Sequence, residues 1–203
     1  MKRQIRPSHR RVITMLQLLK QLLSQKQYAC FYTNRDKTTS FIFGRVLGVN
    51  DKHVAIYMLS PDGEYDGLLI KCTSSIYRVD WDDLYTQEMK DKIKPDQLPS
   101  RELELQDDAF MKSLLSFAKQ SDELVSIELL DSGYEDVVGF VEQVNDETCV
   151  VQQVNSDGKT DGFSLLFMDD ISQIECESQD EIQLQKLFLA ESNKSDRKSG
   201  KNG

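Results

Sequence analysis

The sequence GRVLGVND at residues 44–51 decides the fold, because it returns 95 residues later as GFVEQVND at 139–146. An ungapped comparison of residues 44–89 with 139–184 gives ten identities in 46 positions. The identities fall on turn residues and on apolar positions of the expected strands. This internal similarity predicts that the chain contains two copies of one structural unit, produced by duplication.

Turn residues divide each copy into short strands. Asn50-Asp51 follows an apolar run, and Asn and Asp side chains bond nearby backbone and tolerate left-handed dihedral angles. The pair at 62–63 is Asp-Gly, a strong hairpin signal, because glycine accepts a positive φ. Gly67 and Gly162 open the next expected strand in the two copies, where an isolated glycine indicates a bend. We therefore expect these two glycines at equivalent bent or positive-φ positions.

Alternating and helical apolar periodicities predict the same elements in both copies. The expected strands are 28–33, 41–49, 53–60, 66–71 and 75–80, followed by 124–130, 136–144, 148–155, 161–167 and 171–176. An amphipathic helix precedes each copy, along Met15 to Leu23 and Phe110 to Ala118, the second with Asp107 or Asp108 as its N-cap. Further helices are expected at roughly 82–92 and 178–190.

The expected fold class is mainly β (α+β), with two tandem five-stranded bent barrels. Each barrel has an N-terminal helix and a closing helix. The first unit spans residues 11–92, the linker 93–107, and the second unit 108–190. The tail at 191–203, rich in Ser, Lys, Asn and Gly, is expected to be disordered.

A helix followed by five short antiparallel strands, with a long bent strand carrying the Gly…Val-Asn-Asp pattern, resembles the Sm-like (Lsm/Hfq) superfamily. The closing segments Ile76–Val79 and Ile171–Ile174 are similar to the final strand of that family. Another small SH3-like barrel remains the alternative. The resemblance implies edge-to-edge assembly through the fourth and fifth strands, either within the chain or in an even-numbered ring, because an unpaired strand edge is a template for pairing.

The resemblance also implies a nucleotide pocket, which needs an Arg-Gly pair before the last strand. Those positions are Cys72-Thr73 and Phe167-Met168 in this chain, and neither pair can make the family contacts. Residues 122–188 contain 17 acidic residues against two lysines, and so acidic a surface repels phosphate.

Residues 1–27, in contrast, carry seven Lys and Arg residues and no acidic residue. Nucleic-acid binding is therefore expected at most in the first half. The candidate contact residues are Lys2, Arg3, Arg6, Arg10, Arg11, Asn50, Lys52 and His53. The basic N-terminus is alternatively a solvated lead-in to the first helix, or a segment that docks on the acidic second unit of the same or another chain.

No constellation in the sequence predicts catalysis or a bound cofactor. The four cysteines are widely spaced and the chain has only two histidines, so a zinc site is not expected. The Asp-Gly loops are hairpin turns rather than calcium sites, and Asp82-Asp83 and Asp169-Asp170 are helix-start acids rather than a catalytic pair. We expect no catalytic, metal or cofactor site, and no enzyme.

The expected function is therefore that of a non-enzymatic assembly module, which self-associates or binds a protein partner through its strand edges. Tyr77 and Trp81 are the candidate interface residues, because Tyr and Trp are enriched at interface hot spots; Trp81 is alternatively a packing residue against the closing helix. Binding of RNA or single-stranded nucleic acid through the first unit and the basic N-terminus is the alternative. The chain lacks an apolar run of ~20 residues and a signal-peptide pattern, so no membrane association and a cytoplasmic location are expected.

Overall fold

The computed structural model describes residues 13–99 and 103–199. Its first half contains α1 (Met15–Gln25), β1 (Tyr28–Tyr32), β2 (Ile42–Val49), β3 (His53–Leu59), β4 (Tyr65–Cys72), η1 (Thr73–Ser75), β5 (Arg78–Asp80) and α2 (Leu84–Lys92). After η2 (Pro95–Gln97), the second half contains α3 (Phe110–Ser121), β6 (Leu124–Leu129), β7 (Val137–Val144), β8 (Thr148–Val154), β9 (Thr160–Phe167), η3 (Met168–Asp170), β10 (Ile171–Cys176) and α4 (Gln179–Ser199).

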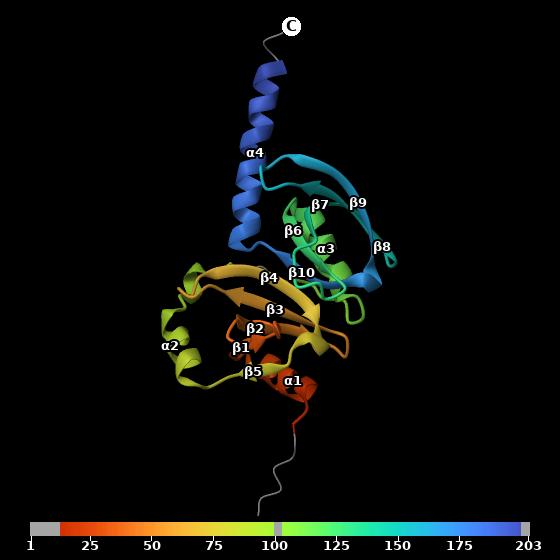
Figure 1. Cartoon of the computed structure of the whole chain (residues 1–203). Helices are drawn as coiled ribbons and strands as arrows, with labels where there is room; N and C mark the ends of the chain where they lie inside the picture. Colours follow the sequence, from red (N-terminus) through yellow and green to blue (C-terminus); the bar gives the residue numbers. More distant parts are fainter. Residues whose placement is uncertain (1–12, 100–102, 200–203) are drawn as a thin grey trace, which may run out of the picture.

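The strands form one antiparallel sheet of ten strands in the order β5-β1-β2-β3-β4-β10-β6-β7-β8-β9. The mainly β class with flanking helices is confirmed. The prediction of two separate barrels is wrong, because β4 pairs with β10 and the sheet remains open. The physical reason is that β4 and β10 are complementary unpaired edges on one chain, and pairing them satisfies both backbones. Figure 1 shows the two bent halves stacked along this seam.

The elements recur at the separation seen in the sequence. Strand β7 begins and ends 95 residues after β2, and the same offset relates β8 to β3 and β9 to β4. The ladder irregularity between Val46 and Gly48 returns between Val141 and Gln143. Gly67 has φ 97° and Gly162 has φ 81°, so the prediction that both occupy a positive-φ position is confirmed.

Local signals explain the helices, with one exception. Thr14 and Gln17 form a reciprocal capping box at the start of α1, as side chain and backbone exchange hydrogen bonds. The prediction of Asp107 or Asp108 as N-cap of α3 is wrong: Ala109 occupies that position and makes no side-chain cap. The turn is instead held from inside the helix, because the Ser113 hydroxyl donates to the Ala109 carbonyl and accepts from the Gln106 amide.

Two apolar clusters form the core. The smaller one lies between α1 and the inner face of the first half. The larger one contains α3 and apolar residues of both halves, including Ile70 of β4 and Ile174 of β10, which are both completely buried. The seam between the halves is therefore part of the hydrophobic core, and the halves are not independent barrels joined by a tether.

The expected linker and tail both carry more structure than their composition suggests. Leu98, Leu103 and Leu105 of the linker pack against the larger cluster. The tail predicted to be disordered from residue 191 is instead helical as far as Ser199. Pro95 ends the chain's helical path after α2, because the residue before a proline disfavours helical angles. Ala190, 95 residues later, imposes no such stop, and α4 continues.

Candidate interaction edges of the sheet

The seam between β4 and β10 shows how two units of this chain pair. Its register places Lys71, Ile70, Leu69 and Leu68 opposite Gln173, Ile174, Glu175 and Cys176. Leu68 is 2% exposed and Ile70 is 0% exposed, and Cys176 is also completely buried. The fourth strand of one half thus uses both its backbone edge and its outward apolar side chains to hold the fifth strand of the other.

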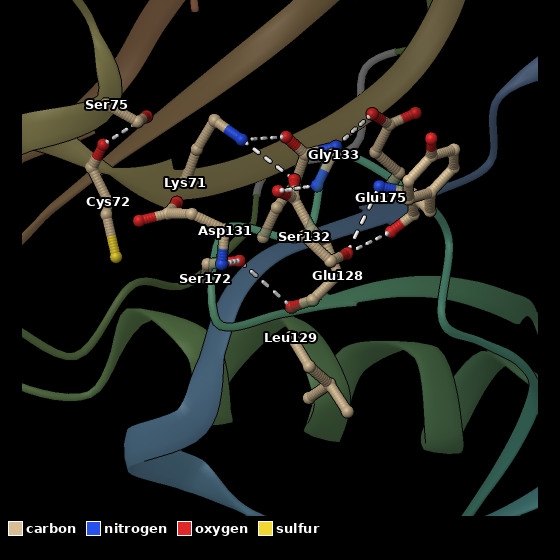
Figure 2. Close-up of polar contacts among 12 residues, drawn as sticks. Lys71, Cys72, Ser75, Glu128, Leu129, Asp131, Ser132, Gly133, Ser172 and Glu175 are labelled. Carbon is tan, nitrogen blue, oxygen red and sulfur yellow. Dashed lines mark hydrogen bonds and ion pairs between the residues drawn. The ribbon is translucent and has the colours of Figure 1, made fainter. Parts of the chain in front are cut away.

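A buried ion pair fixes this seam. Figure 2 shows Lys71 reaching from β4 toward Glu128 of β6; its Nζ lies 2.9 Å from Glu128 Oε2 and 2.6 Å from Gln173 Oε1. The other Glu128 oxygen accepts a hydrogen bond from the Gly133 amide at 3.0 Å. Both charged side chains are buried, and their bonds are made only when β4 lies in this register.

The same seam orders the loop between β6 and β7. The Ser172 hydroxyl donates to the Glu128 carbonyl and accepts from the Asp131 amide, as Figure 2 shows. Leu130 and Asp131 take positive φ values there, and the Leu130 amide donates to the Asp170 carbonyl. The loop is therefore a fixed part of the junction.

The sheet ends on the remaining fourth and fifth strands, β9 and β5. Strand β9 presents three large apolar side chains to solvent: Phe163 is 64%, Leu165 is 61% and Phe167 is 60% exposed. Phe163 and Leu165 lie 95 residues after Leu68 and Ile70, which the internal seam buries. A long apolar edge strand is normally covered or interrupted by charges, but the part of β9 from Phe163 to Phe167 is uncovered and contains no charged residue.

The opposite end of the sheet has a matching surface. Trp81, directly after β5, is 38% exposed, whereas its counterpart Cys176, the last residue of β10, is completely buried. Leu16 of α1 is half-buried and Lys20 is exposed, although Met111 and Leu115, their counterparts on α3, are buried. The residues that α3 and β10 use in the internal seam therefore have uncovered counterparts on α1 and beside β5.

Of the two interface candidates from the sequence, only Trp81 lies at a free edge. The Tyr77 hydroxyl donates to the Asn34 carbonyl at 3.2 Å, and its ring lies beside Tyr32 and under the Arg35 guanidinium. Tyr77 is thus held within the first half.

Of the candidate nucleic-acid residues, the three that the structure describes, Asn50, Lys52 and His53, share one turn. Asn50 caps its turn: its side-chain oxygen accepts from the Lys52 and His53 amides, and its amide nitrogen donates to the Asp107 carbonyl. His53 has a buried Nδ1, and burial together with the Lys52 charge lowers its pKa. Lys2, Arg3, Arg6, Arg10 and Arg11 lie outside the described residues.

Sequence reasoning missed Phe163, Leu165 and Phe167. The segment 163–167 reads FSLLF, and its apolar content correctly indicated a strand. The signal that could have found them is a comparison of the two copies. If the fourth strand of the first copy pairs inside the chain, the fourth strand of the second copy has no such partner and stays at the sheet edge. Composition alone does not distinguish the two.

A carboxylate cluster lies where β10 leads into α4. Burial, followed by the nearby carboxylates of Glu181, Glu135 and Asp66, raises the pKa of Glu175 to about 8, although Lys71 acts in the opposite direction. The Gln173 side-chain amide donates to Glu175 at 2.6 Å. Burial also raises the pKa of Glu135 and of Asp66. The folded protein therefore retains a proton on Glu175 at neutral pH.

This cluster predicts that the protein loses stability as pH rises. The folded state binds a proton on Glu175 between about pH 4.3 and 8 that the unfolded chain has released, so the free energy of unfolding falls across that range. Allowing for the partial exposure of the side chain, we expect Glu175→Gln to remove about 2 kcal/mol of this dependence. Urea denaturation from pH 5 to 9 measures it, with Glu142→Gln, a substitution of an exposed glutamate on β7, as the control. An unchanged pH profile in Glu175→Gln would contradict the assignment.

The two bent-strand glycines provide a second matched prediction. A Cβ on Gly67 would lie 2.6 Å from the Cys176 carbonyl oxygen and 2.7 Å from the Ser178 nitrogen, whereas one on Gly162 meets nothing within 4 Å. Gly67→Ala is expected to destabilise the fold by about 3 kcal/mol, and Gly162→Ala by about 1 kcal/mol from its positive φ alone. Thermal unfolding of the dilute protein compares the two; equal losses would contradict the difference in packing.

Comparisons with known proteins assign no family: the chain matches no protein-family model, no curated protein and no solved structure. Across residues 13–99 and 103–199, no helix has the length and apolar character needed to cross a membrane. The same residues contain no group of three or more His, Cys, Asp or Glu side chains placed to hold a metal ion.

Proposed function

We propose that the chain is a duplicated Sm-like unit that acts as a non-enzymatic assembly module, with copies joining head to tail through β9 of one copy and β5 of the next. One observation carries the proposal. The chain already pairs the fourth strand of one half with the fifth strand of the other, and the same two kinds of strand remain free at its ends.

The internal seam supplies a register for the proposed contact. Shifting it by 95 residues places Leu165 opposite Val79 and Phe163 opposite Trp81. The exposed apolar side chains of β9 would then face α1 of the neighbour, as Leu68 and Ile70 face α3 within the chain. Burying them provides the main stabilisation of the contact, because hydrophobic free energy scales with the apolar area removed from water.

A head-to-tail contact repeats, so it closes into a ring when the rotation between copies allows, and otherwise extends as an open chain. Each copy contributes two units, so the assembly contains an even number of units. A strand of a different protein is the competing occupant of β9, since an exposed sheet edge can accept any extended segment of suitable side chains.

Sedimentation velocity of the intact protein over two orders of magnitude in concentration tests the proposal. The expected result is a dimer or larger species that persists at moderate salt, because its contact is mainly apolar. A monomer at every concentration would overturn self-association and leave β9 to a different partner.

The setting proposed is the cytoplasm. All four cysteines are free thiols, and Cys30, Cys149 and Cys176 are buried. Burial raises the pKa of Cys30 to about 12 and that of Cys149 to about 11, so both act as small core residues and not as reactive groups. Buried thiols without disulfides fit a reducing compartment.

A further inference from the structure

The linker covers the outer face of the first half. A Cβ on Gly63 would lie 2.9 Å from the Lys92 backbone, and one on Gly48 would lie 2.4 Å from Leu105, so the described linker residues on either side of 100–102 contact the turn after β3 and strand β2. Beneath it and α3, Ala55, Tyr57 and Leu68 are buried. The linker that leads into α3 therefore also packs on the same sheet face as α3.

The second half repeats the first of these contacts, but its chain then takes a different course. Gly158 lies against Leu187 and Phe188, the counterparts of Lys92 and Ile93. From there, however, α4 continues to Ser199 and does not turn back. Figure 1 shows it projecting past the second half of the sheet. The outer side chains of β9 consequently remain exposed.

The segment equivalent to the linker is the N-terminus. Residues 96–107 lead into α3, and residues 1–12 lead into α1 at the same distance along the chain. Helix α1 and strand β9 lie in different halves of the molecule in Figure 1, so we take the N-terminus of a neighbouring copy as the occupant of β9. In the proposed head-to-tail contact, α1 of that copy takes the place of α3.

Charge supports this occupant. Residues 1–12 contain five Lys and Arg residues and no acidic residue, whereas residues 122–188 contain 17 acidic residues and two lysines. Arg3 and Arg10 stand where the linker has Leu98 and Leu105. Arginine suits the exposed phenylalanines of β9, because its stem covers apolar surface and its guanidinium stacks on aromatic rings.

We infer that residues 1–12 of one copy form a basic strap across the outer face of β9 in the next copy, in the position that the linker residues 96–99 and 103–107 take within the chain. The inference rests on the proposed head-to-tail assembly. It assigns the basic N-terminus to an acidic protein surface of a second copy.

The test compares the self-association of the full chain with that of a variant lacking residues 1–12, by sedimentation equilibrium at about 50 and about 300 mM salt. The full chain is expected to associate at least tenfold more tightly at low salt than at high salt. The truncated chain is expected to associate more weakly and with little salt dependence. Equal affinity and equal salt dependence in the two proteins would overturn the strap.

A deletion removes both the chain segment and its charge, whereas substitution of the arginines removes the charge alone. A variant with Arg3, Arg6, Arg10 and Arg11 changed to Ser should behave like the truncated chain. A control with the same net charge replaces the exposed lysines Lys37, Lys92, Lys94 and Lys119 by Ser and should keep the affinity of the full chain. Equal weakening in both variants would show a net-charge effect and overturn the strap. A full chain that never associates would overturn the proposed function and the strap together, whereas salt-insensitive association overturns only the strap.

Discussion

Replacing Leu165 by aspartate is expected to convert the assembled protein into a monomer with an intact fold. The side chain is 61% exposed in the single chain, so the carboxylate is solvated there and the fold is unaffected. In the assembly it would occupy the place that completely buried Ile70 has in the internal seam. Burying an unpaired charge there should weaken association at least about 100-fold, as light scattering after gel filtration would show.

Leu130→Asp is the matched control, because it makes the same chemical change at a leucine that is 74% exposed and lies in the loop between β6 and β7, outside β9 itself. Its positive φ tolerates aspartate. We expect this variant to assemble as the original chain does. Assembly that survives Leu165→Asp, or that is lost equally in the control, would show that the β9 edge does not make the contact.

Glu128→Ala is expected to cause the largest loss of folding stability, about 3–5 kcal/mol. The substitution leaves the buried Lys71 ammonium with Gln173 alone, and it leaves the Gly133 amide without its acceptor. Both groups are then buried without the hydrogen bonds or opposite charge that offset their desolvation. Large mutational losses of stability commonly have this cause. Urea denaturation of the dilute protein measures the change in the free energy of unfolding.

The double variant Lys71→Met with Glu128→Gln should recover most of that loss. Methionine fills the volume of the lysine stem without a charge, and glutamine keeps a side-chain oxygen for Gly133. The exposed pair of Lys112 and Asp146 provides the reference, since Asp146→Ala should change stability by less than about 1 kcal/mol. A Glu128→Ala loss no larger than this reference would contradict the structural role of the buried pair.

The strands were predictable from sequence because their signals are local. Alternating apolar residues and the Asn-Asp and Asp-Gly turns place nine of the ten strands within one residue of each observed end. The closing strand of the first half, expected at 75–80, is only Arg78–Asp80, because Ser75 belongs to η1 and the ladder with β1 includes only residues 78–80. The positive φ of Gly67 and Gly162 followed from the same reasoning.

The seam between the halves was beyond such reasoning. Pairing of β4 with β10 joins segments about a hundred residues apart, and no local pattern selects it over pairing between two chains. The exposure of Leu165 follows from that choice, so it was equally invisible. The helical tail was missed for a different reason, because composition suggested disorder while the absence of a proline near Ala190 allows α4 to continue.

Disulfide cross-linking between copies tests the head-to-tail register most directly. Phe163→Cys and Trp81→Cys are made in separate chains, mixed and oxidised, so that only an intermolecular bond can join the two positions. Residues directly opposite each other in antiparallel strands lie within reach of a disulfide. The account predicts a cross-linked dimer in this mixture, and none from wild-type chain or from Trp81→Cys mixed with Leu130→Cys. No cross-link at concentrations where the protein is assembled, or equal cross-linking in the control mixture, would contradict it.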